Sequence, residues 1–194
     1  MDTLTIIQGI SGNCGDSARI GIITVSDRAS SGEYQDEGGP AILHFFREAI
    51  ISPLEITYSC IADDQAMIER EIIRMSDDLD CSVVVTTGGT GPALRDVTPE
   101  ATAAVCDKIL DGFGEQMRAI SLQYVPTAIL SRQIGGIRGS CLVFNLPGRP
   151  KSIRETIDEI WRAVPYCVDL IGGPYIDMDD TVCQAFRPKD SSRR

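Results

Sequence analysis

Two aspartates and a glycine-rich turn have the residue types needed to hold a metal ion against phosphate groups. The turn, residues 88–91, follows an apolar β-branched run and leads to Arg95 and Asp96. Closely spaced glycines let backbone N–H groups converge on an anion, because no Cβ blocks the approach. A carboxylate cannot bind an anion, so Asp96 indicates a divalent cation. Asp63 follows a second predicted strand, and magnesium typically takes one or two carboxylates together with water and substrate phosphates.

Each of these features also has a simpler explanation. A tight turn accounts for the glycines as well as a phosphate does. The turn matches neither a P-loop, which needs a following Gly-Lys-Ser/Thr, nor the Gly-x-Gly-x-x-Gly motif. Asp63 could cap the helix that follows it, and Asp96 could pair with a nearby arginine. The isolated motifs therefore leave these alternatives open.

The elements that must position these residues alternate between strands and helices. We predict strands at 19–27, 54–61, 82–87 and 140–145, and helices at 40–50, 68–75, from 98 onward, 115–124 and 153–164. This alternation predicts an α/β fold, a three-layer α/β/α sandwich with a mostly parallel, Rossmann-like sheet. Right-handed crossovers bring successive strand ends to one edge. Ser26-Asp27, Asp63-Asp64 and Thr86-Thr87 should therefore meet where open α/β sheets bind ligands.

Local signals refine this picture. Thr98 is expected to cap a helix whose first residue is Pro99, and Ser152 and Glu155 have capping-box spacing. Trp161 falls on an apolar stripe and should be core. The segment 4–8 could be a short edge strand. We divide the chain into an uncertain extension at 1–18, one domain at 19–176 and a tail at 177–194.

Bulk composition excludes several classes of protein. With 194 residues, 43% of them hydrophobic, the chain should form one globular domain. No run of about 18 apolar residues is present, and the first residues lack the basic start of a secretory signal, so we expect a cytoplasmic protein. A net charge of −10 argues against nucleic acid and anionic membranes as partners.

The cysteines and the single histidine suggest no site of their own. Seven cysteines are an odd number without CxxC spacing, which favours neither a disulfide scaffold nor a zinc site. We expect them to pack as small hydrophobic residues. His44 is the one histidine, so multi-histidine metal sites are excluded and a packing or surface role is expected.

Taken together, the motifs resemble the molybdopterin adenylyltransferase family of molybdenum-cofactor biosynthesis, in its bacterial MogA-type branch. The matching segments are 24–32, 86–92, 95–102, 112–118, 128–132 and 145–148. Related domains occur in eukaryotic two-domain cofactor proteins and in gephyrin. The resemblance implies that the terminal phosphate of molybdopterin attacks the α-phosphate of ATP, with Mg²⁺, giving adenylylated molybdopterin and pyrophosphate. It also implies a homotrimer and a possible molybdenum-insertion partner protein.

The resemblance assigns roles to individual residues. Asp63 and Asp96 match the family's two functional aspartates and would hold the magnesium, and Ser131 matches its molybdopterin-side serine. The expected substrate- and nucleotide-binding residues are Ser26, Asp27, Gly88, Gly89, Thr90, Gly91, Arg95, Ser131, Arg132, Asn145, Pro147 and Gly148. The chain departs from the family at Ala62, where a proline is common, and at Leu94. Loss of the proline is expected to loosen the Asp63 loop without removing its carboxylate.

Three other functions compete with an adenylyltransferase. A molybdopterin-binding scaffold would bind the pterin but release no pyrophosphate from ATP. A nucleotide pyrophosphatase would consume ATP without a pterin. A plain nucleotide-binding regulator is least favoured, because no base-recognition motif such as a GTPase signature is present.

Overall fold

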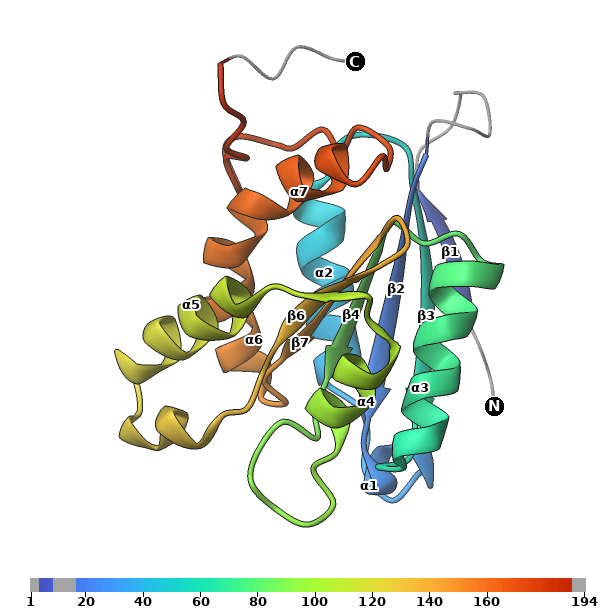
Figure 1. The fold of residues 1–194 in the computed structure, drawn as a ribbon, viewed down its shortest axis with the longest axis vertical. Coiled ribbons are helices and arrows are strands. Elements are labelled where there is room, and N and C mark those ends of the chain that lie inside the picture. Colours follow the sequence, from blue (N-terminus) through green and yellow to red (C-terminus); the bar gives the residue numbers. More distant parts are fainter. Residues whose placement is uncertain (1–3, 9–16, 190–194) are drawn as a thin grey trace.

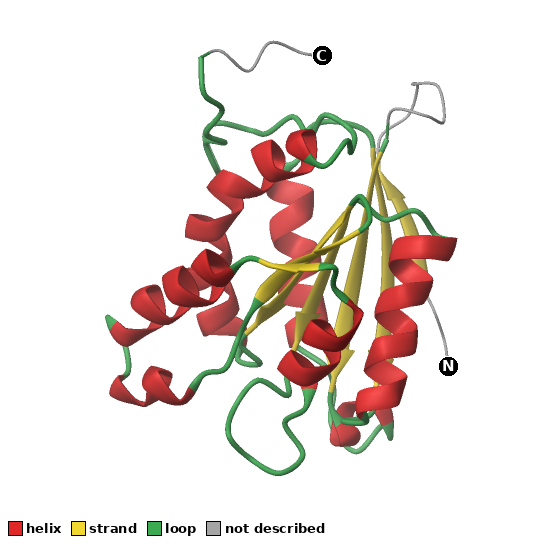
Figure 2. Cartoon of the chain, in the orientation of Figure 1, coloured by secondary structure: helices red, strands yellow, loops and turns green. Residues whose placement is uncertain are grey.

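The computed structural model describes residues 4–8 and 17–189, which form one seven-stranded sheet with helices on both faces (Figures 1 and 2). The strand order is β1-β3-β2-β4-β7-β6-β5. The strands are β1 Leu4–Gln8, β2 Ala18–Val25, β3 Leu54–Ile61, β4 Val83–Thr87, β5 Lys108–Ile109, β6 Gly135–Arg138 and β7 Cys141–Leu146. The four central strands β3, β2, β4 and β7 pair in parallel, and the others pair antiparallel. The predicted α/β sandwich with a mostly parallel sheet is confirmed.

Helices cover the two faces as separate apolar layers. They are α1 Asp27–Ser30, α2 Gly38–Ala49, α3 Gln65–Ile73, α4 Thr98–Val105, α5 Asp111–Leu122, α6 Pro150–Ile160 and α7 Val164–Leu170. One core packs α2, α5, α6 and α7 against the sheet, and the other packs α3 and α4. Trp161 is fully buried against Phe45 and Phe46, so its predicted core position is confirmed.

Two local predictions were wrong. The capping box fails because α6 begins at Pro150, with Arg149 at the cap, so Ser152 already lies inside the helix. Pro150 fixes a helical φ and needs no N–H partner, which makes it a stronger start signal than the serine. Thr98 is the first residue of α4 rather than its cap, and its hydroxyl donates to the Gly88 carbonyl at 2.9 Å.

The remaining predictions concern the chain ends and isolated residues. Leu4–Gln8 is an edge strand, antiparallel to β3, whereas residues 9–16 lie outside the described part. In the tail, Met178 and Cys183 are buried.

The six cysteines of the described segments are free thiols, and His44 lies on the surface of α2 beside Glu48. Among the described helices, none has the length and apolar character to cross a bilayer.

Candidate functional site

The carboxyl ends of the parallel strands meet at one edge of the sheet, as their order requires. In register, Thr24 of β2 lies opposite Thr87 of β4, and Thr87 lies opposite Leu146 of β7. The Thr87 hydroxyl donates to the Pro147 carbonyl at 2.8 Å, and a Cβ placed on Gly148 would lie 3.5 Å from the Gly88 Cα. The turn after β4 therefore packs directly against the Pro-Gly segment after β7.

The glycine turn has a conformation that requires glycine. Gly88 and Gly89 have φ values of +97° and +63°, and a Cβ on Gly88 would lie 2.2 Å from the Val25 carbonyl oxygen. Thr98 clamps the turn, since its backbone N–H donates to the Gly89 carbonyl at 3.1 Å. Within residues 17–189, the N–H groups of residues 89–91 donate no hydrogen bond. These donors, in the turn that follows β4, are suited to an anion.

Both predicted aspartates face this turn. A Cβ on Gly89 would lie 3.4 Å from Asp63 Oδ1, and a Cβ on Gly91 would lie 2.9 Å from Asp96 Oδ2. Burial raises the pKa of Asp63, and the charges of Asp27 and Asp96 act in the same direction. The two carboxylates are thus close enough for the charge of Asp96 to raise the pKa of Asp63, whereas the hydrogen bond from Asp27 and the charge of Arg95 lower it.

Each aspartate has one carboxylate oxygen that accepts no hydrogen bond from the described residues. Asp63 Oδ2 accepts from the Asp27 backbone N–H at 2.8 Å, and Asp96 Oδ2 accepts from the Ala93 N–H at 2.9 Å. Among the described residues, no hydrogen bond uses the Oδ1 atom of either. The same part of the chain has no cluster of three or more His, Cys, Asp or Glu able to hold a metal. A cation that needs only two protein carboxylates fits this donor set.

The simpler explanations for the two aspartates do not hold. Asp64, not Asp63, caps α3, since its side chain accepts from the Met67 N–H at 2.9 Å. No arginine pairs with the Asp96 carboxylate within the described residues. The Asp63 loop is also well fixed without the missing proline, because the Asp64 N–H donates to the Ala62 carbonyl at 2.8 Å.

The two arginines of the site are already engaged by the protein. Arg132 Nε donates to the Gly91 carbonyl at 2.8 Å, and its guanidinium also reaches the Asp96 carbonyl and the Glu100 carboxylate. Arg95 holds Asp27 in a bidentate pair, with Nη2 at 2.8 and 2.7 Å from the two carboxylate oxygens. Arg132 therefore shapes the loop from within, and Arg95 ties the loop to the end of β2.

The remaining predicted residues divide into surface and interior positions. Ser26 caps α1, where its hydroxyl accepts from the Ala29 N–H at 3.3 Å. Ser131 follows a short 3-10 helix at Pro126–Leu130, and its hydroxyl donates to Gln133 Oε1. Asn145 is fully buried in β7, so its side-chain amide forms its hydrogen bonds with protein groups.

The Asn145 amide links β7 to β4, to α4 and to the segment before β6. Its Nδ2 donates to Thr86 Oγ1 at 3.0 Å and to Thr102 Oγ1 at 2.8 Å, and its Oδ1 accepts from the Ile134 N–H at 3.2 Å. Gln133, which sequence reasoning missed, donates to the Asn145 carbonyl at 3.2 Å. No alternation or motif marks Gln133, because the segment before β6 is irregular. We therefore regard Asn145 as a residue that positions the strand ends.

Asn145→Ala should lower the free energy of unfolding by at least about 2 kcal/mol, since it leaves buried hydrogen-bonding groups without partners. Urea unfolding followed by circular dichroism measures this loss. Asn145→Asp keeps the acceptor but not the donors and should also destabilise. Stability equal to the parent protein in both variants would contradict this positioning role.

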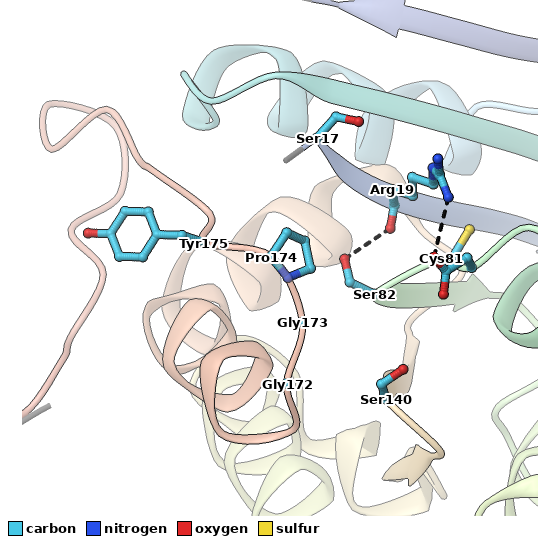
Figure 3. Close-up of a pocket in the computed structure, with 10 residues that line it drawn as sticks. Ser17, Arg19, Cys81, Ser82, Ser140, Gly172, Gly173, Pro174 and Tyr175 are labelled. Carbon is cyan, nitrogen blue, oxygen red and sulfur yellow. Dashed lines mark hydrogen bonds and ion pairs between the residues drawn. The ribbon is translucent and has the colours of Figure 1, made fainter. Parts of the chain in front are cut away.

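A cavity of about 490 Å³ lies at the opposite edge of the sheet and contains none of the predicted site residues (Figure 3). Its one guanidinium, that of Arg19, pairs with Asp80 at 3.3 Å and with Glu55 at 3.5 Å. The Cys81 thiol beside it is buried, which raises its pKa to about 12 and keeps it unreactive. The cavity has no converging donors comparable to those of the glycine turn.

This chain is similar in sequence to a family of known proteins. Residues 21–166 match a family described as a probable molybdopterin binding domain. A molybdopterin adenylyltransferase of Helicobacter pylori is 56% identical over 170 residues, which cover 88% of this chain and 97% of the relative. That of Escherichia coli K12 is 50% identical over 190 residues, covering 92% and 97%.

A solved structure and a longer relative extend the comparison. The molybdopterin biosynthesis enzyme MoaB of Thermus thermophilus superposes with a TM-score of 0.74 at 38% identity, covering 81% of this chain and 99% of that one. Gephyrin of Dictyostelium discoideum is 34% identical over 159 residues, but these cover 22% of its length. The similarity spans the whole glycine-turn edge.

Proposed function

This chain belongs to the family of probable molybdopterin-binding domains, and from that premise we propose that it is a molybdopterin adenylyltransferase. It transfers AMP from ATP to the terminal phosphate of molybdopterin, giving adenylyl-molybdopterin and pyrophosphate. The observation that carries the proposal is the pair Asp63 and Asp96 beside a glycine turn whose N–H groups donate no hydrogen bond to the described residues. A plain nucleotide-binding protein has no need for two carboxylates at its phosphate site.

The residues at this edge suit a resident Mg²⁺, which Asp63 and Asp96 would hold. When bound, this ion neutralises phosphate charge and polarises the P–O bonds. The chain's own residues do the remaining work by positioning. The N–H groups of residues 89–91 orient the triphosphate, and Thr98 and Arg132 keep the turn in its conformation. The attacking phosphate is ionised near neutral pH, so the reaction needs no histidine base.

Two alternative functions differ from an adenylyltransferase in the products that they would release. A scaffold would bind the pterin without releasing pyrophosphate, and a nucleotide pyrophosphatase would consume ATP in the absence of pterin. The purified protein is therefore incubated with ATP, Mg²⁺ and molybdopterin, and the pterin is analysed by mass spectrometry. A mass increase equal to one AMP moiety, with pyrophosphate release that depends on the pterin, supports the proposal. Pterin-independent turnover of ATP, or an unchanged pterin, contradicts it.

Ser131→Ala should mainly weaken molybdopterin binding or slow the transfer, with ATP affinity retained. Ser131 lies at the pterin side in the family, and here it follows an exposed segment at the same edge as the glycine turn. Fluorescence titration with the pterin and single-turnover rates measure the two effects. Ser121→Ala, on α5, is a control away from the turn. If neither pterin affinity nor rate changes, the assignment of Ser131 is wrong.

We also propose that the protein assembles as a homotrimer, acts in the cytoplasm, where ATP is supplied, and hands its product to a molybdenum-insertion partner. Support for assembly comes from exposed apolar side chains that follow one another in sequence from the last residue of α5 through the turn after it to the 3-10 helix. They are Leu122, Tyr124, Val125, Ile129 and Leu130. Apolar patches of this kind are typical of interfaces. Sedimentation velocity measures the oligomeric state.

A further inference from the structure

Asp27 connects the loops that carry the two proposed metal-binding aspartates. It exchanges hydrogen bonds with Asp63, since the Asp27 N–H donates to Asp63 Oδ2 at 2.8 Å and the Asp63 N–H donates to Asp27 Oδ1 at 3.0 Å. This reciprocal pair joins the end of β2 to the end of β3. The position of the Asp63 carboxylate is therefore tied to the backbone of Asp27.

The same Asp27 carboxylate also holds the loop of Asp96. Arg95 donates to it from Nη2 to both oxygens and from Nε at 3.1 Å. Arg95 and Asp96 are consecutive residues, so one peptide unit separates this ion pair from the second metal-binding carboxylate. A continuous series of contacts thus runs from Asp63 through Asp27 and Arg95 to Asp96.

We infer that Asp27 and Arg95 are positioning residues that set the separation of Asp63 and Asp96, and hence the affinity of the site for a divalent cation with nucleotide. The inference rests on the proposed function, because it assigns the pair a purpose at that metal site. Both carboxylate oxygens of Asp27 accept hydrogen bonds within the protein, as a positioning role requires. Groups that orient metal ligands typically change metal affinity or activity by about 10–100-fold when removed.

Charge alone makes a different prediction from positioning. Arg95 is positive, so its removal would strengthen cation binding if only its electrostatic field mattered. Removal of the negative Asp27 would weaken cation binding on the same ground. Positioning predicts a loss in both variants, because each breaks the same link. Arg95 is therefore the informative residue, and its side chain is 65% exposed, so its replacement should not disturb the fold.

The experiment measures the binding of α,β-methylene-ATP, which cannot be cleaved at the reacting bond, by isothermal titration calorimetry. Each protein is titrated with the nucleotide, once in saturating Mn²⁺ and once in EDTA. The Kd in EDTA divided by the Kd in Mn²⁺ gives the contribution of the metal to nucleotide affinity. Arg95→Gln and Asp27→Asn should each reduce this ratio by about 10-fold or more. The double variant should reduce the ratio no further than either single variant does, because each of the three proteins lacks the same Asp27–Arg95 ion pair.

Controls separate the inference from the proposed function. Asp77→Asn removes a carboxylate that also pairs with an arginine, Arg138, but lies far from the glycine turn, and it should leave the ratio unchanged. Asp96→Asn should abolish the metal contribution. If Asp96→Asn retains it, the proposed metal role fails. A different outcome overturns the positioning inference alone. In it, Asp96→Asn loses the metal contribution, but Arg95→Gln binds α,β-methylene-ATP with Mn²⁺ as tightly as the parent protein or more tightly.

Discussion

Asp96→Asn should lower the rate of adenylyl transfer by about 10²-fold or more, the scale expected for loss of an important electrostatic group. Asparagine has nearly the same shape, and its carbonyl oxygen can still accept from the Ala93 N–H that now donates to Asp96 Oδ2. The loop should therefore keep its conformation. The variant loses the negative charge that faces Gly91 beside Asp63.

The rate is measured as pyrophosphate release with ATP, Mg²⁺ and molybdopterin. Asp78→Asn is a matched control, because it makes the same chemical change at the opposite edge of the sheet, after α3. The loss in Asp96→Asn should lie in kcat, with a much smaller change in thermal stability than in rate. Turnover near that of the parent protein would refute the assigned role of Asp96.

Much of this edge could be predicted because its signals are local. The strands β2, β3 and β4 each have polar residues at the carboxyl end or within two residues after it, and parallel pairing brings those ends together. The three closely spaced glycines likewise indicated a tight turn, and Gly88 and Gly89 have positive φ values there. Patterns of this kind depend only on residues adjacent in sequence.

Contacts between distant residues were beyond such reasoning. Arg132 and Arg95 were expected among the substrate- and nucleotide-binding residues, and the folded chain pairs each with a carboxylate, that of Glu100 and Asp27 respectively. These partners lie 32 and 68 residues away along the chain. An arginine near a phosphate site has the same sequence signature whether it binds the ligand or shapes the loop.

Short and irregular elements were missed for a different reason. The strand β6 begins with Gly135-Gly136, which have no side chains to show an alternating pattern, and β5 has two residues. A Cβ on Gly136 would lie 2.8 Å from the Cys106 sulfur, so close packing requires glycine there although glycine weakens strand propensity. Tertiary packing, rather than local preference, determines this edge of the sheet.

Gly88→Ala should be the most disruptive small substitution at the site, lowering the free energy of unfolding by about 2–5 kcal/mol. Two separate costs contribute. The φ of +97° is unfavourable for any residue with a Cβ, and that Cβ would lie 2.2 Å from the Val25 carbonyl oxygen. A backbone atom of the central strand β2 cannot move aside as a flexible side chain would.

Gly139→Ala separates the two costs, because Gly139 has a φ of +54° and a Cβ there would meet no atom within 4 Å. It should lose only the conformational part, about 1–2 kcal/mol, and keep full nucleotide affinity. Urea unfolding gives both losses, and calorimetry with α,β-methylene-ATP and Mn²⁺ gives the affinity. If Gly88→Ala folds by shifting the turn away from β2, the N–H groups of residues 89–91 move with it, so its affinity should fall even in the folded fraction. Equal stability and equal affinity in the two variants would mean that contact with Val25 does not hold the turn in place.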